Sequence, residues 1–181
     1  FGEFKSETTT KYITLVEKDT IKLDRTGYAL DEKLSYLNSN KDIVSVNEFG
    51  EVTAIKKGKA TITLVSEKTH DTKYEIEVKS SNESVEVEEV KLNKEEIKLK
   101  IGESSTIAYE IEPKNATNQN VSWYSTNEEV AIVDNGKITA KGNGVATILV
   151  KTGNNKIAKA EVKIGENALL DVINNDDVLA Q

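Results

Sequence analysis

The chain carries one pattern of residues twice. Residues 38–64 read NSNKDIVSVNEFGEVTAIKKGKATITL, and residues 125–150 read STNEEVAIVDNGKITAKGNGVATILV. Asn40 aligns with Asn127 at an offset of 87 positions, and after one inserted residue in the first copy Gly50 aligns with Gly136 at an offset of 86. An offset that holds over a whole segment indicates duplication. The sequence therefore predicts two copies of one small domain and not a single large one.

Apolar and polar residues alternate through much of both copies. In residues 73–79 (KYEIEVK) the side chains of Tyr74, Ile76 and Val78 are predicted to face a core, and four charged side chains to face water. The same alternation occurs around residues 97–101, 107–111 and 157–164 and is typical of antiparallel strands with one buried face. Turn signals separate these segments at short intervals. The pattern predicts an all-β chain of two β-sandwiches, with about seven short antiparallel strands each.

The strongest turn signal is Asp134-Asn135-Gly136-Lys137. It predicts a two-residue hairpin, because Asn-Gly accepts a positive φ at both turn positions. The first copy has Asn47-Glu48-Phe49-Gly50 at this point, which is one residue longer. The two hairpins are therefore expected to differ in their turns.

The repeat also predicts the limits of the modules. Residues 11–80 are expected to form module 1 and residues 85–165 module 2, with a polar linker at residues 81–84. Residues 1–10 are expected to be a disordered N-terminus or a remnant of cloning. Residues 166–181 are expected to be a tail or the start of a following segment.

Module 1 is expected to be a shortened sandwich. Ile21 and Tyr36 are 15 positions apart, whereas Ile97 and Trp123, which we align with them, are 26 positions apart. This difference predicts that module 1 lacks about one strand in this segment.

Composition argues against several classes of site. The chain has no cysteine, which excludes disulfides and thiolate metal ligands, and its single histidine, His70, argues against a zinc site built from histidines and against a Ser-His-Asp triad. A net charge of −7 argues against a nucleic-acid partner or an anionic membrane. No apolar run approaches the roughly 20 residues that span a bilayer. We predict no catalytic residue, no metal ligand and no cofactor.

Two runs of the second copy follow one family pattern. The opening run V-x-L-N-K-x-x-x-x-L-x-x-G-E is matched by Val90, Leu92, Asn93, Lys94, Leu99, Gly102 and Glu103. The later run is an aromatic residue, S-x-N, V-A-x-V, G-x-[VI]-T-A and G-x-A-x-I, matched by Trp123, Ser125, Asn127, Val130-Ala131, Val133, Gly136, Ile138-Thr139-Ala140, Gly144, Ala146 and Ile148. By these residues the second copy resembles the bacterial immunoglobulin-like domain, group 2, found in intimin- and invasin-type adhesins and other bacterial surface proteins. The first copy is a divergent match, with Tyr36, Asn38 and Val44 at the aromatic, Ser and Ala positions.

The resemblance implies two tandem immunoglobulin-like sandwiches whose shared residues serve packing. Trp123 is expected to be the central core anchor. Val130, Val133, Ile138 and Ile148 are expected to fill the core, and the small side chains of Ala140 and Ala146 to lie where strands approach closely. The motif specifies a fold and not a reaction.

The candidate polar sites are weak. A glycosidase needs two carboxylates that face each other across a cleft, and adjacent residues on a strand point to opposite faces. Each of the five pairs of adjacent acidic residues is therefore expected to be solvated charge and not a catalytic pair: Asp31-Glu32, Glu88-Glu89, Glu95-Glu96, Glu128-Glu129 and Asp176-Asp177. Residues 174–177 (NNDD) are the best calcium candidate but lack the spaced pattern of a calcium loop. His70 is expected to be exposed in a turn. Tyr124 is expected to face outward, where it either stacks on a sugar or covers a neighbouring strand.

These observations leave two classes of function open. The first is a non-catalytic, extracellular pair of modules at a bacterial cell surface, or secreted, that serves adhesion or interaction or acts as a spacer in a stalk or surface layer. The second is an accessory segment that attaches a larger secreted enzyme to carbohydrate or cell wall. In either case the expected partner is a protein or polysaccharide at a cell surface. The sequence does not select the ligand, the ligand-binding residues or the oligomeric state.

Overall fold

The computed structural model describes residues 8–29 and 31–165. The chain forms two compact units. Of the described residues, one unit holds those up to Glu89 together with Ile111–Ser122 and Lys151–Lys156, and the other holds Val90–Glu110, Trp123–Val150 and residues 157–165. The predictions for residues 1–7, for the tail at residues 166–181 and for the calcium candidate at residues 174–177 lie outside the described residues.

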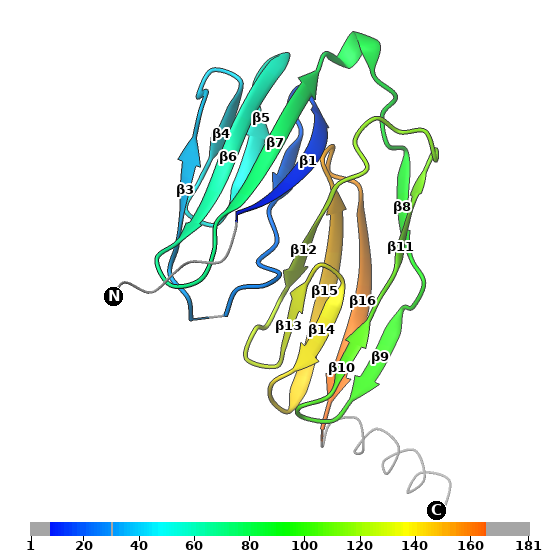
Figure 1. Cartoon of the computed structure of the whole chain (residues 1–181). Coiled ribbons are helices and arrows are strands. Elements are labelled where there is room, and N and C mark those ends of the chain that lie inside the picture. Colours follow the sequence, from blue (N-terminus) through cyan, green and yellow to red (C-terminus); the bar gives the residue numbers. More distant parts are fainter. Residues whose placement is uncertain (1–7, 30, 166–181) are drawn as a thin grey trace, which may run out of the picture. The chain divides into compact units, whose positions relative to one another are not determined.

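The first sandwich consists of seven strands in two sheets (Figure 1). One sheet has the order β1-β7-β6-β3 and the other β2-β5-β4. The strands are β1 (Thr9–Val16), β2 (Thr20–Lys22), β3 (Leu34–Asn38), β4 (Val44–Val46), β5 (Glu51–Ala54), β6 (Gly58–Ser66) and β7 (Thr72–Lys79). A single 3-10 turn, η1 (Ser81–Glu83), follows β7.

The second sandwich consists of nine strands in three sheets. Their orders are β12-β15-β16-β9, β10-β14-β13 and β11-β8. The strands are β8 (Glu89–Leu92), β9 (Glu96–Leu99), β10 (Ser104–Thr106), β11 (Tyr109–Glu112), β12 (Val121–Ser125), β13 (Ala131–Asp134), β14 (Lys137–Ala140), β15 (Gly144–Thr152) and β16 (Ile157–Ile164). The predicted all-β class and the two sandwiches are confirmed.

The alternation in the sequence becomes alternation of burial. In β7, Tyr74, Ile76 and Val78 are at most 4% exposed. They lie in the first core with residues from the other sheet, such as Val44 and Val52, because successive side chains of a strand point to opposite faces. In the second sandwich Trp123, Ile138 and Ile148 are buried as predicted, as are Val130, Ala140 and Ala146. Val133 is only half-buried.

The hairpin prediction is confirmed. Asp134 pairs with Lys137 across a two-residue turn in which Asn135 has φ 46° and Gly136 φ 81°. In the first sandwich the longer turn is organised by Asn47, whose Oδ1 accepts hydrogen bonds from the backbone N–H groups of Phe49 and Glu51. The turn accommodates its extra residue because the Asn47 side chain accepts hydrogen bonds that a backbone oxygen would otherwise accept.

The prediction of antiparallel strands throughout is wrong for one strand in each sandwich. β1 pairs in parallel with β7 over eight residue pairs, and β9 pairs in parallel with β16 over four. Each of these strands lies at the edge of its four-stranded sheet and runs in the direction of the last strand of its sandwich. An alternating pattern looks the same for either direction, so the sequence periodicity could not distinguish them.

The predicted alignment of Ile21 with Ile97 is also wrong. Ile97 pairs with Val162 in the second sandwich, and the equivalent pair in the first is Ile13 with Ile76. Ile21 pairs with Val52 in the first sandwich, and the equivalent pair in the second is Ser105 with Ile138. The counterpart of Ile21 is therefore Ser105. From Ser105 to Trp123 is 18 positions, so the first copy is shorter by three residues (18 − 15) and not by eleven. Among its described residues it has no counterpart of the β8–β11 sheet.

Candidate functional site

The motif residues make the same hydrogen bonds in both sandwiches. Ser125 Oγ donates to the backbone oxygen of Ala131 at 2.7 Å. At the aligned position of the first sandwich, Asn38 Nδ2 donates to the backbone oxygen of Val44 at 2.8 Å. The change from Ser to Asn therefore keeps the bond that holds β12 to the start of β13 in the second sandwich and β3 to the start of β4 in the first.

The shared asparagine forms the turn that follows. Asn127 Oδ1 accepts a hydrogen bond from the N–H of Glu129, and Asn40 Oδ1 accepts one from the N–H of Asp42. The backbone oxygen of the same asparagine accepts the N–H groups of the residues three and four positions later in both copies. These contacts are a side-chain-stabilised turn, which explains why this position is Asn twice.

A core aromatic lies against a hairpin glycine in each sandwich. A Cβ on Gly136 would lie 3.4 Å from the Trp123 ring, and a Cβ on Gly50 would lie 2.6 Å from the Tyr36 hydroxyl. Trp123 is 8% exposed and also packs edge-on against Tyr109, with 5.9 Å between ring centroids. Tyr36 is half-buried, and this burial raises the pKa of its phenol above the ordinary value. The expectation that Trp123 anchors a core is confirmed.

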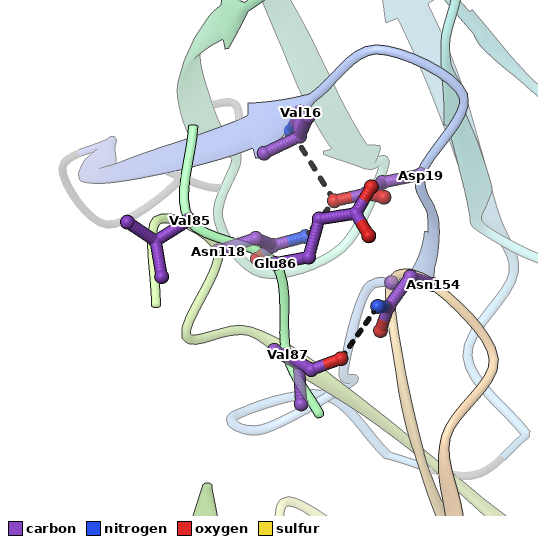
Figure 2. Close-up of a pocket in the computed structure, with 8 residues that line it drawn as sticks. Val16, Asp19, Val85, Glu86, Val87, Asn118 and Asn154 are labelled. Atoms are coloured by element: carbon purple, nitrogen blue, oxygen red, sulfur yellow. Dashed lines mark hydrogen bonds between the residues drawn. The ribbon is translucent and has the colours of Figure 1, made fainter. Parts of the chain in front are cut away.

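A partly buried polar cluster lies in the unit that contains the first sandwich. We call it the Asp19 cluster: Asp19, Asn118, Asn120, Gly153 and Asn154. Asp19 Oδ2 accepts hydrogen bonds from Asn118 Nδ2 at 2.8 Å and from the N–H of Val16 at 3.2 Å. Asn154 Nδ2 donates to the backbone oxygen of Val87 at 2.8 Å, as Figure 2 shows beside the Val16–Asp19 bond.

Backbone contacts extend this cluster along β2. The N–H of Thr20 donates to the backbone oxygen of Gly153 at 3.1 Å, and the N–H of Lys22 donates to Ser122 Oγ at 2.7 Å. Asn120 Nδ2 donates to the backbone oxygen of Thr14 at 3.1 Å. β2 pairs with β5 on one side, and two of its N–H groups are satisfied by Ser122 and Gly153.

Asp19 is 8% exposed, and the burial of its carboxylate raises the pKa above the ordinary aspartate value. The hydrogen bonds from Asn118 and Val16 act in the opposite direction, and the charge of Glu86 adds a smaller increase. A Cβ on Gly153 would lie 2.8 Å from Asp19 Oδ2, so only glycine allows this close approach. The pocket beside these residues holds about 10 Å³, room for a single water molecule and not for a sugar or peptide.

Sequence reasoning did not identify this cluster. Lys18-Asp19 aligns with Gly102-Glu103, so Asp19 occupies the acidic position of the opening motif. This alignment is the one sequence signal that could have drawn attention to Asp19. Nothing in the sequence near Asn118 indicates that it is 97% buried. The cluster can fix backbone segments, and it contains neither a nucleophile nor a second titratable group within hydrogen-bond distance of Asp19.

Two predictions about polar residues are wrong. Glu32 is 7% exposed and accepts a hydrogen bond from Thr69 Oγ1, whereas it was expected to be solvated. His70 is half-buried and stacks on Tyr28 with 4.4 Å between ring centroids, whereas it was expected to be exposed. Glu32 lies in the irregular segment between β2 and β3, and His70 packs on Tyr28 of that segment. The alternating pattern gives no guide to burial there.

The other acidic pairs in the described part of the chain are exposed as expected: Glu88-Glu89, Glu95-Glu96 and Glu128-Glu129. Asp176-Asp177 lies outside the described residues. Tyr124 is half-buried. Within residues 8–29 and 31–165, no group of three or more His, Cys, Asp or Glu side chains is placed to hold a metal ion. The same residues contain no helix with the length and apolar character of a membrane span.

Comparison with known proteins agrees with this arrangement. The family profile described as "Bacterial Ig-like domain (group 2)" matches residues 4–78 and 86–162. A comparison with curated protein sequences gave no match.

Solved structures that resemble the chain include surface proteins. The S-layer protein rSbsC(31-844) is 21% identical over 77% of this chain and 21% of its own length, with a TM-score of 0.40. A 282-residue intimin fragment, in complex with the intimin-binding domain of its translocated receptor Tir, is 15% identical over 83% of this chain and 60% of its own, with a TM-score of 0.36. The Yersinia pseudotuberculosis adhesin InvE is 12% identical over 84% and 56%, with a TM-score of 0.34. The chain thus spans about a fifth of the S-layer structure and just over half of the two others.

The family profile accounts for both copies of the repeat and for most of the chain, and the residues that carry its pattern form the two cores and their turns. The chain belongs to the bacterial Ig-like domain (group 2) family, of which it contains two tandem copies.

Proposed function

We infer that the chain is a non-catalytic pair of modules in a bacterial cell-surface or secreted protein, where it serves as an interaction or spacer unit. One observation carries this proposal: the residues that the two copies share are used for packing and backbone hydrogen bonds. Ser125 and Asn38 make equivalent hydrogen bonds to the following strand of their own sandwich, and Asn127 and Asn40 form equivalent turns. A residue repeated for chemistry would instead converge on a cavity.

The surface is suited to recognition without turnover. The formal charge of −7 favours a partner that is neutral or basic. Short sandwiches with exposed strands and loops present such a partner with a fixed surface, whether the partner is a protein or a polysaccharide. The proposal includes an extracellular location, which rests on family membership.

The alternative role, an accessory segment that attaches a secreted enzyme to carbohydrate or cell wall, is favoured by one specific observation. Tyr12 on β1 is 80% exposed, and the ring faces away from the core. An aromatic face in water is the usual platform for the apolar side of a sugar ring.

The test is to incubate the purified 181-residue protein with isolated bacterial cell walls, host matrix proteins and a panel of glycans. Retention by one protein or polysaccharide class, without release of product, is the expected result. No retention at high protein concentration would leave only the spacer role. Turnover that disappears when one surface carboxylate is replaced would overturn the proposal.

A further inference from the structure

The outer face of the sheet β1-β7-β6-β3 carries an exposed apolar pair. Tyr12 is 80% exposed and Leu37 is 62% exposed. Tyr12 pairs with Glu75, which pairs with Thr61, and Leu37 pairs with Thr63. Residues paired across a sheet share a face, so these five side chains all lie opposite the core. We call this surface the Tyr12 face.

The second sandwich shows that the fold does not require this ring. Tyr12 pairs with Glu75 as Glu96 pairs with Glu161, so Glu96 occupies the position of Tyr12. Glu96 lies 3.6 Å from Lys163 Nζ and 3.8 Å from Lys98 Nζ. The second sandwich therefore covers the matching position with ion pairs, whereas the first presents an aromatic ring to water.

The space between Tyr12 and Leu37 is polar and carries one acidic and one basic side chain, Glu75 and the exposed Lys73, whose charges balance. Thr61 Oγ1 donates to Glu75 Oε2 at 2.8 Å, which holds the carboxylate on the sheet. Thr63 and Thr10 add two hydroxyl groups on the same face. Neighbouring strands are about 4.8 Å apart, and successive residues of a strand about 3.3 Å. Leu37 lies three strand gaps from Tyr12 and two residues further along the sheet, so the two positions are roughly 16 Å apart. An extended ligand could touch both.

We propose that the Tyr12 face binds a neutral polysaccharide, with the Tyr12 ring stacked against a sugar and the threonine hydroxyl groups bonded to its hydroxyls. This rests on the proposed interaction role. Two separated apolar side chains are too few for a protein interface, which needs about 800 Å² on each partner and a packed apolar centre. A polyanion such as a phosphate-rich wall polymer is disfavoured by the net charge of −7.

The test is native gel electrophoresis of the 181-residue protein in gels containing dextran, xylan, mannan or mixed-linkage β-glucan, with polygalacturonate as the anionic comparison. At least one neutral polymer is expected to retard the protein and polygalacturonate is not. Tyr12→Ala should weaken the retardation on the order of tenfold, while Tyr12→Phe keeps it, because stacking needs the ring and not the hydroxyl.

The matched control is Glu96→Ala, which changes the same register position in the second sandwich and should leave the retardation unchanged. Circular dichroism would show that every variant is folded. Absence of retardation by all four neutral polymers, equal retardation of Tyr12→Ala and wild type, or stronger retardation by polygalacturonate would each overturn the proposal. None of these results would overturn the wider interaction role, which is tested separately by retention on cell walls, matrix proteins and glycans.

Discussion

The two sandwiches build the same turn with different residues. In the first, Lys18 has φ 76° and precedes Asp19; in the second, Gly102 has φ 88° and precedes Glu103. The acid accepts the N–H three positions before it in both, through Asp19 Oδ2 at 3.2 Å and Glu103 Oε1 at 2.8 Å. Asp19 is buried and Glu103 is exposed. The fold thus fixes the hydrogen bonds of this turn, whereas the residues packed around it determine whether its carboxylate is buried or exposed.

A similar comparison applies to the cores. Trp123 and Tyr36 occupy one position and lie against the glycine of the same hairpin. Trp123 is almost fully buried, and its Nε1–H has no hydrogen-bond partner among the described residues. Tyr36 is half-buried, and its pKa is raised by that burial. The second core therefore depends more on its aromatic than the first, and this difference can be measured.

The largest effect is expected from removing the two aromatics. Trp123→Ala should lower the free energy of unfolding of the second sandwich by about 3–5 kcal/mol, because it leaves a large cavity. Tyr36→Ala should cost the first sandwich about 1–3 kcal/mol, because less of the ring is buried. Calorimetry and amide exchange in β6 and β15 would measure both. Equal costs would show that the two cores depend equally on their aromatics.

The next effect distinguishes the two hairpin glycines. Gly136→Ala should cost about 2–4 kcal/mol, because φ is 81° and the new Cβ would lie 2.8 Å from the backbone oxygen of Ile107. Gly50→Ala has the same φ, but its Cβ meets the end of the Tyr36 side chain, which can move, so about 1–2 kcal/mol is expected. Urea unfolding followed by fluorescence of Trp123, the only tryptophan, reports the first variant. A smaller cost for Gly136→Ala than for Gly50→Ala would contradict the geometry.

A smaller effect tests the interchangeable side chains. Ser125→Ala and Asn38→Ala each remove one partly buried hydrogen bond and should each cost about 0.5–1.5 kcal/mol. The exchanges Ser125→Asn and Asn38→Ser serve as controls and should stay within about 0.5 kcal/mol of wild type, because either side chain can reach the carbonyl. Thermal melting of the four variants would measure this. If the exchanges were as costly as the alanines, the hydrogen bonds would not be equivalent.

The smallest effect expected is a dependence on pH from Asp19. Its pKa is raised in the folded state, so the folded protein holds this proton at a pH where the unfolded chain, with a pKa near 3.8, has released it. The contribution of Asp19 to stability is therefore largest below pH 3.8 and falls as the pH rises through the raised value. Asp19→Asn should remove this part of the slope in urea midpoints measured from pH 3 to pH 7. Identical slopes for variant and wild type would show that burial does not act on this carboxylate.

Periodicity and turn chemistry were sufficient to predict the strands and the Asn135-Gly136 hairpin, because each depends on residues close in sequence. The burial of Trp123 was predicted from the family resemblance. Strand direction was not predictable, since β1 and β9 alternate in the same way whether they run parallel or antiparallel to their partners. The burial of Asp19, Glu32 and Asn118 was not predictable either. A polar side chain is buried when distant groups supply its hydrogen bonds, and no local pattern records where those groups come from.

The parallel pairing of β1 with β7 has a mechanical consequence. The two strands are the first and last of their sandwich, so a force that pulls the chain apart at both ends loads them in opposite directions along their length. The ladder must then shear, with its evenly spaced bonds sharing the load, and cannot open one bond at a time. Eight residue pairs carry this load in the first sandwich and four in the second. We therefore expect the second sandwich to yield before the first when the chain is pulled at both ends.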